Sequence, residues 1–343
     1  MSEPQTSGAD LSAVPEAWLR ENPKLSNRQI FRHALARFAE QDPRLVLLEA
    51  DLGGGGDPFE ARHKDRYFNL GICEATMLDM ACGMAHVGHI VFAHTFAPFG
   101  AMRACEQVRL GMAYPRANVK LVCDYGGLSG AFFGPTHHAI EDLAILRAMP
   151  GMMVLSPADG LETILATRAM IDHAGPVYMR LGRNRVSRLE EPRGGFTLGR
   201  ALCFREGSDV GLIAHGEVGV SVALEAAWRL EAQGVSARVV NMHTLKPLDE
   251  VAVLETAERT RLLVTVEEHT ILGGLGGAVC ETVCSQGLGR RVLRIGIQDR
   301  YDPLAGSHES LLRGHGLDGA AVAERVLDSL STGGTDAAAK ANG

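Results

Sequence analysis

The feature that most constrains the fold is a repeated alternation of short apolar segments with helical patterns. Apolar runs at 45–50 (LVLLEA), 119–123 (VKLVC) and 177–180 have the length of strands that are buried on both faces. Each of the first strands leads through a loop into a helical pattern, and Ser26 precedes another such helix as its predicted cap. This order predicts an α/β fold with a mostly parallel sheet that is covered on both faces.

The alternation occurs twice, in two doubly wound domains. A second series of strands and helices follows a break in composition at 190–200 (EEPRGGFTLGR), which we interpret as a linker. The predicted divisions are a polar lead-in at 1–24, a first domain at 25–189, a second domain at 201–330 and a disordered tail at 331–343.

Composition excludes several classes of protein. Of the 343 residues, 46% are hydrophobic and 22% are charged, which allows sizeable cores. The net charge of −7, without a basic block, argues against nucleic acid as a partner. We find no apolar run of about 18 residues and no secretory segment, so we expect no membrane span. The seven cysteines form no C-x-x-C pair, which favours a reducing cytoplasm over disulfides or a zinc site.

The segment 67–83 (YFNLGICEATMLDMACG) carries the first chemical signal. It begins with strand-forming residues, is interrupted at Gly71 and continues as a helix with Glu74 in its first turn. An acid at this position is often an ordinary solvent-facing residue. It can also be a carboxyl group held in a pocket to bond a cofactor nitrogen, and this segment alone leaves both interpretations open.

Four segments in order resemble one family. They are LGICEATM (70–77), HTFAPF (94–99), GPTHHAIEDLAILRAMPGMMVLSPADG (134–160) and VEEHTILGGLGGAV (266–279). From about residue 25 to residue 330 the chain is similar to the C-terminal two-thirds of a transketolase. That portion comprises the pyrimidine-binding domain and the C-terminal domain of a thiamine-diphosphate enzyme. The resemblance favours the pocketed interpretation of Glu74.

The resemblance implies a cofactor site. Glu74 corresponds to the carboxyl group that lies against N1′ of the aminopyrimidine and acts as a general acid and base. Phe96 and Phe99 would form the apolar wall around the pyrimidine, with Phe99 stacked on the ring. Ile72 and Asp51 correspond to positions near the cofactor.

The resemblance also implies a substrate site. His137 matches a histidine that contacts sugar hydroxyls or phosphate, and Arg28 and Arg180 stand where arginines bind a sugar phosphate through paired donors. Two positions depart from the family pattern: Tyr125 replaces a histidine and Phe133 replaces an aspartate. An apolar ring cannot accept a hydrogen bond from a sugar hydroxyl, so we expect an acceptor other than the ordinary aldose phosphates.

The family's diphosphate-binding GDG motif is missing from the chain. The resemblance therefore implies that a separate N-terminal subunit holds the diphosphate and its Mg²⁺, with no metal ligand in this chain. A hetero-oligomer, of α2β2 form, is the expected assembly. Ala158-Asp159-Gly160 is not a substitute, because in the family this ADG opens a plain helix of the pyrimidine domain.

The predicted function is the pyrimidine-binding subunit of a split transketolase-like enzyme. It would transfer a two-carbon ketol unit from a ketose phosphate to an aldehyde. One alternative is a decarboxylating relative, similar to deoxyxylulose-phosphate synthase or to the β subunit of a 2-oxo-acid dehydrogenase, which would release CO₂ from pyruvate. Another is a regulatory or scaffold subunit with a degenerate site, against which the presence of Glu74, Phe96, Phe99 and His137 argues.

Overall fold

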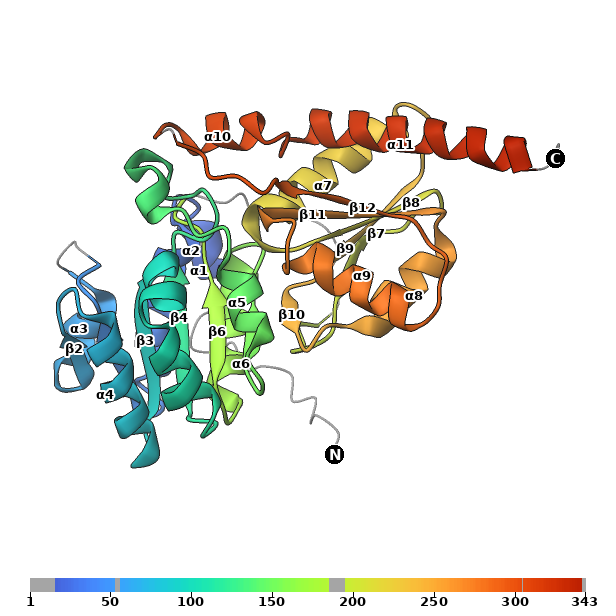
Figure 1. Ribbon diagram of the computed structural model, residues 1–343. Coiled ribbons are helices and arrows are strands. Elements are labelled where there is room, and N and C mark those ends of the chain that lie inside the picture. Colours follow the sequence, from blue (N-terminus) through green and yellow to red (C-terminus); the bar gives the residue numbers. More distant parts are fainter. Residues whose placement is uncertain (1–15, 53–55, 185–194, 304, 341–343) are drawn as a thin grey trace.

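The computed structural model describes residues 16–52, 56–184, 195–303 and 305–340, and it confirms the predicted α/β fold with two mostly parallel sheets (Figure 1). The first sheet has seven strands in the order β10-β5-β6-β4-β3-β1-β2. Its strands are β1 (Leu45–Glu49), β2 (Tyr67–Asn69), β3 (Ile90–Phe96), β4 (Val119–Asp124), β5 (Met153–Leu155), β6 (Val177–Arg180) and β10 (Thr244–Lys246).

Strand β10 is the antiparallel member of this sheet, and it comes from the second half of the chain. Thr244 is paired with Leu155 of β5, and Lys246 with Val154. A three-residue edge strand has too short a periodicity for the sequence alone to reveal it. The second half of the chain thus completes the first sheet and ties the two units together.

The helices of the first unit pack on both faces of its sheet. They are α1 (Glu16–Glu21), α2 (Asn27–Phe38), α3 (Pro58–Arg62), α4 (Glu74–His86), α5 (Asp142–Ala148) and α6 (Gly160–Asp172). Ser26 caps α2 in a reciprocal capping box with Gln29. The segment after β3 forms two π-helices, η2 (Phe99–Arg103) and η3 (Gln107–Ala113). Short 3-10 turns are η1 (Lys64–Arg66), η4 (Ala131–Phe133) and η5 (Pro135–His137).

The second unit is built on a five-stranded sheet in the order β12-β11-β8-β9-β7. Strand β7 pairs antiparallel with β9, and the other pairs are parallel. The strands are β7 (Leu202–Arg205), β8 (Val210–Ala214), β9 (Ala237–Asn241), β11 (Leu262–Thr270) and β12 (Val292–Ile297). The helices are α7 (Gly216–Glu231), α8 (Glu250–Arg259), α9 (Leu275–Ser285), α10 (His308–Gly314) and α11 (Gly319–Lys340).

Apolar packing joins the two units into one body. One core lies beneath α2 and α6 on one face of the first sheet. A second begins beneath α4 on the other face and continues into the second unit, where it includes Ile213, Leu263 and Val279. The third lies beneath α7 and α11, which run together along the far side of the second sheet (Figure 1).

Three predicted boundaries can be compared with these elements. Helix α11 continues to Lys340, into the tail that we expected to be disordered from residue 331. The lead-in contains α1, while its first 15 residues and positions 190–194 of the predicted linker lie outside the described residues. Within the described part of the chain, no helix is both long and apolar enough to cross a membrane.

Candidate active site

Glu74 is the first residue of α4, and its side chain is almost completely buried, with 1% exposed. The chain turns into the helix at Gly71, whose φ of 76° lies in the left-handed region that glycine adopts without strain. Cys73 then donates its thiol to the Leu70 carbonyl and holds the turn closed. This tight entry places a carboxyl group inside the protein at the positive end of a helix, so the solvent-facing interpretation of Glu74 does not hold.

Arg103 pairs with this carboxyl group. Its Nη1 donates to both oxygens of Glu74, at 3.1 and 2.9 Å. The same guanidinium lies over the Phe99 ring, 4.1 Å from the ring centre. Phe99 and Arg103 are the two ends of η2, so a spacing of four residues brings the cation over the ring.

Six rings form a continuous aromatic cluster beside Glu74 and Arg103. Phe96 lies 4.3 Å from Tyr125 and 5.8 Å from His137, and Phe99 lies 5.2 Å from His137. Phe133 stacks on His137 at 4.3 Å. The members of the aromatic cluster are Phe96, Phe99, Tyr125, Phe132, Phe133 and His137.

The cluster gathers at the carboxyl ends of parallel strands. Phe96 ends β3, Tyr125 follows β4 with a φ of 59°, and His137 ends η5. In open α/β sheets this edge is where ligands bind. Phe132 and Phe133 are each 48% exposed, so the cluster is open on one side.

The surroundings of His137 favour its neutral imidazole. Partial burial, followed by the charge of Arg103, lowers the pKa of His137. Its Nδ1 lies 2.9 Å from the Thr136 hydroxyl, which leaves Nε2 for a ligand. A neutral imidazole at this position can donate or accept one hydrogen bond.

A buried chain of charges holds Arg28 beside the aromatic cluster. Arg28, from α2, pairs with Asp124 at 2.9 Å, donates to the Leu52 carbonyl and lies 6.0 Å from the Phe96 ring. His94 joins Asp124 at 3.1 Å to Glu49 at 3.0 Å. Burial opposes the charged form of His94, but Asp124 and Glu49 together outweigh it and raise the pKa of His94. This series of buried charged groups therefore fixes Arg28 in position.

Two predicted cofactor positions lie outside the aromatic cluster. Asp51 is exposed and has a φ of 48°. Its backbone N–H donates a hydrogen bond to the side-chain oxygen of Asn69. Ile72 is 72% exposed in the turn before Glu74. Both could reach a cofactor only from their own loops.

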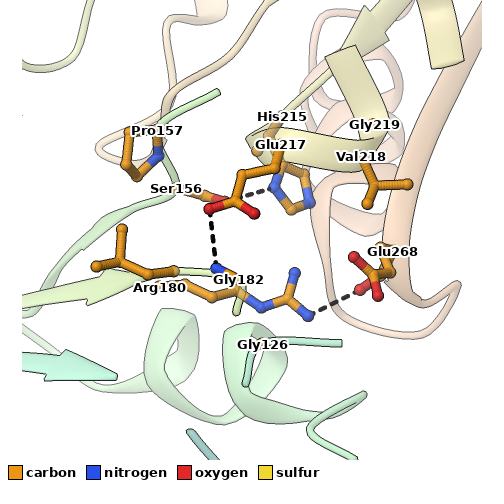
Figure 2. Close-up of a pocket in the computed structure, with 12 residues that line it drawn as sticks. Gly126, Ser156, Pro157, Arg180, Gly182, His215, Glu217, Val218, Gly219 and Glu268 are labelled. Carbon is orange, nitrogen blue, oxygen red and sulfur yellow. Dashed lines mark hydrogen bonds between the residues drawn. The ribbon is translucent and has the colours of Figure 1, made fainter. Parts of the chain in front are cut away.

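Arg180 does not belong to this cluster, and the structure contradicts its predicted role. It ends β6 and is 5% exposed, paired with Asp142 at 3.1 Å. Its Nη2 donates to the backbone carbonyl of Glu268 (Figure 2) and also to that of Ala139. A guanidinium with these partners cannot bind a sugar phosphate without leaving a buried carboxylate unpaired.

Arg183 takes the position that we assigned to Arg180. Its guanidinium lies 4.5 Å from the centre of the Phe132 ring, and its Nε donates to the Tyr125 hydroxyl at 2.9 Å. The sequence carried a signal for this choice, since both arginines stand in MRLGR but only Arg183 lies beyond the end of the strand. Ligands bind outside the carboxyl ends of strands, where a loop side chain is free to face them.

The second unit holds the loops that carry this site. Glu217, beside the pocket in Figure 2, accepts the Gly182 N–H at 3.0 Å, and burial raises the pKa of Glu217 to about 8. Glu268 accepts the Leu128 N–H at 2.7 Å and meets Nε2 of His308 at 2.6 Å. The other nitrogen of His308 bonds Asn184 at 2.6 Å. These contacts reach the loop that carries Tyr125 and the loop that carries Arg183.

The donor set fits an aminopyrimidine. A buried carboxyl group can face a ring nitrogen, and adjacent aromatic faces can stack on a flat heterocycle. Within the described ranges, no group of three or more His, Cys, Asp or Glu side chains is arranged to hold a metal ion.

These features define a two-domain α/β protein with a pyrimidine-type site at a sheet edge. Residues 23–188 match the model of the transketolase pyrimidine-binding domain, and residues 199–322 match that of the transketolase C-terminal domain. The chain therefore belongs to the transketolase family, of which it represents these two domains.

Its relatives include chains of similar length. A putative transketolase C-terminal section of Methanocaldococcus jannaschii is 38% identical over 307 residues, which cover 88% of this chain and 96% of the relative. The 6-deoxy-6-sulfo-D-fructose transketolase subunit SqwH of Clostridium sp. is 38% identical over 290 residues, or 84% of this chain and 87% of the relative. A solved split-gene transketolase, described as an inactive β4 tetramer, superimposes with a TM-score of 0.81 at 38% identity. The superposition covers 90% of the present chain and 99% of the solved split-gene transketolase chain.

Proposed function

We propose that this chain is the pyrimidine-binding subunit of a two-chain, thiamine-diphosphate-dependent transketolase. It transfers a two-carbon ketol unit from a ketose phosphate to an aldehyde. The observation that carries the proposal is the buried carboxyl group of Glu74 beside the aromatic cluster. The names of the relatives support the two-chain form, since they describe a C-terminal section, a subunit and a split gene.

Glu74 and Phe99 provide the cofactor contacts of this chain. When bound, thiamine diphosphate supplies the electron sink that carbon–carbon bond cleavage requires. Glu74 holds a proton at pyrimidine N1′, where its burial keeps water from competing for the bond. Phe99 and Phe96 cover the ring, and Asp51 and Ile72 approach it from their loops.

Three side chains around the open side of the aromatic cluster receive the substrate. Arg183 lies 4.5 Å from the Phe132 ring and supplies guanidinium donors for a phosphate. Arg28 lies 6.0 Å from the Phe96 ring, and because Asp124 and the Leu52 carbonyl engage its Nε and Nη2, it can add a donor from Nη1. His137 lies among the rings with Nε2 available and moves a proton to or from a sugar oxygen. Arg183 replaces Arg180 in this assignment.

Phe133 and Tyr125 set the choice of acceptor. The phenyl ring of Phe133 stacks on His137, and the Tyr125 hydroxyl already accepts from Arg183. The Phe133 ring offers no acceptor where the family pattern has a carboxylate, so a hydroxylated aldose would lose a hydrogen bond on binding. The acceptor is therefore a less hydroxylated aldehyde, used with a phosphorylated donor.

The diphosphate and its Mg²⁺ are assigned to a partner subunit. The chain carries no GDG motif, which motivates an α2β2 assembly with an N-terminal transketolase subunit. A cytoplasmic location is consistent with the seven cysteines, all of which are free thiols.

Reconstitution tests the proposal. The chain is mixed with the product of a neighbouring reading frame that carries GDG and a downstream Asn. Ketol transfer to a panel of aldehydes is then measured with and without thiamine diphosphate and Mg²⁺. We expect transfer only with both chains and the cofactor, and loss of transfer in Glu74→Gln. Release of CO₂ from pyruvate would instead identify a decarboxylating relative, and no thiamine-dependent turnover in either assay would refute the proposal.

A further inference from the structure

We propose that Arg103 is a gate on the cofactor site: it holds Glu74 in an ion pair and covers Phe99 until the aminopyrimidine displaces it. This inference rests on the proposed function, and it assigns a positioning role to a residue outside the predicted site. The two groups that would receive the pyrimidine are the two groups that Arg103 contacts.

Hydrogen-bond chemistry makes the ion pair and the pyrimidine contact exclusive. Both oxygens of Glu74 accept from Nη1 of Arg103, so the paired group is an ionised carboxylate that can only accept. The N1′ atom of a neutral aminopyrimidine carries no hydrogen and is also an acceptor. Two acceptors cannot share a bond without a proton between them. The contact needs a proton on a Glu74 oxygen that faces N1′, and Nη1 of Arg103 already occupies both oxygens.

The Phe99 ring presents the same competition. The guanidinium of Arg103 lies 4.1 Å from the ring centre, which is the separation of a stacked group. A pyrimidine stacked on that face of Phe99 requires the same space. One side chain therefore occupies the hydrogen-bonding position and the stacking position together, and one movement releases both.

The Arg103 side chain has room to move, whereas the Glu74 side chain is buried. The Arg103 side chain is 47% exposed, whereas Glu74 is 1% exposed. Arg103 is also the last residue of a π-helix, an irregular turn that often occurs at functional sites. Gly100 of the same turn packs so closely that an added Cβ would lie 2.6 Å from the Cys123 sulfur, so the backbone stays in place. The displacement is thus a rotation of an exposed side chain.

The gate predicts that removing the cation strengthens cofactor binding. Thiamine diphosphate with Mg²⁺ is titrated calorimetrically into the reconstituted two-chain enzyme, for the wild type and for Arg103→Met. Because a half-exposed ion pair contributes about a factor of five in an equilibrium constant, we expect Kd to fall about fivefold at low salt. Higher ionic strength should raise the wild-type affinity toward that of the variant.

Three further variants isolate the effect. Arg109→Met removes an equally charged, 60% exposed arginine from the neighbouring π-helix, where it pairs with Glu106, and should leave Kd unchanged. Arg103→Lys keeps the charge without the flat guanidinium, should give an intermediate Kd and replaces the Met variant if that one fails to assemble. In a Glu74→Gln background the pair is already broken, so Arg103→Met should change Kd little.

The outcomes separate this inference from the proposed function. If the wild-type complex binds the cofactor and Arg103→Met binds it equally or more weakly, Arg103 is a permanent support for Glu74 and the gate is wrong. If the wild-type complex binds no thiamine diphosphate at all, the proposed function fails and the gate fails with it. Calorimetry reports both results without any measurement of turnover.

Discussion

The pair formed by Glu268 and His308 lies between the C-terminal domain and the candidate active site. We predict how its removal changes the stability of the protein. His308 begins α10, and its Nε2 lies 2.6 Å from Glu268 with side-chain exposures of 15% and 10%. Burial opposes the charged imidazole, but the Glu268 carboxylate and the nearby Glu217 together outweigh it and raise the pKa of His308 above its ordinary 6.5. The perturbation is His308→Ala.

The expected loss of stability depends on the partners that Glu268 retains when His308 is removed. Breaking a buried ion pair costs about 3–5 kcal/mol when the remaining charge has no other partner. Glu268 retains the Leu128 N–H at 2.7 Å and some solvent exposure, so we expect about 2–3 kcal/mol. For a chain of 343 residues that loss corresponds to a fall in the melting temperature of about 3–4 °C.

The pH dependence of this loss has a definite sign. A histidine whose pKa is raised on folding contributes its full stabilisation below the unfolded pKa of 6.5, and the contribution is lost as the pH rises through the folded pKa. The difference between wild type and His308→Ala should therefore be largest near pH 6 and should shrink toward pH 9.

Calorimetric melting of both proteins across this pH range is the assay. His86→Ala, which removes an exposed imidazole whose partner is the Cys82 carbonyl rather than a carboxylate, is the matched control and should leave the melting temperature nearly unchanged. A destabilisation by His308→Ala that is the same at pH 6 and pH 9 would refute the charged pair, because a neutral hydrogen bond has no such dependence.

Three other predictions concern the site itself. Glu74→Gln should lower kcat of the reconstituted enzyme by about 10²-fold or more with assembly intact, as measured at saturating cofactor, because an amide cannot exchange a proton with N1′. Phe133→Asp should raise kcat/KM for ribose 5-phosphate relative to the native acceptor in a competition assay; an unchanged ratio would make Phe133 a packing residue. The purified chain without its partner should bind thiamine diphosphate more weakly than micromolar in calorimetry with Mg²⁺, and tight binding by the lone chain would contradict the split site.

The sequence was most informative where one pattern repeats along a whole element. The buried strands and the capping box at Ser26 follow from local composition, and the structure has both. The aromatic cluster could be anticipated because Phe96, Phe99 and His137 stand in segments that resemble a family. Strand β10 could not, because it acquires its geometry only from pairing with β5 in the other unit.

The arginines show why side-chain roles were harder to predict. Arg180 and Arg183 are three residues apart in the same segment, and guanidinium chemistry alone suits either one to bind a phosphate. The difference lies in long-range partners: Asp142 and the Glu268 carbonyl bury Arg180, whereas Tyr125 and Phe132 hold Arg183 in the open cluster.

Arg103 shows the same limit in a different way. Its spacing of four residues from Phe99 is visible in the sequence, but its ion pair with Glu74 spans 29 positions and depends on the fold. The residues that recognise a ligand can be inferred from their own chemistry. The residues that hold or release them are defined by contacts, and a single sequence does not record those contacts.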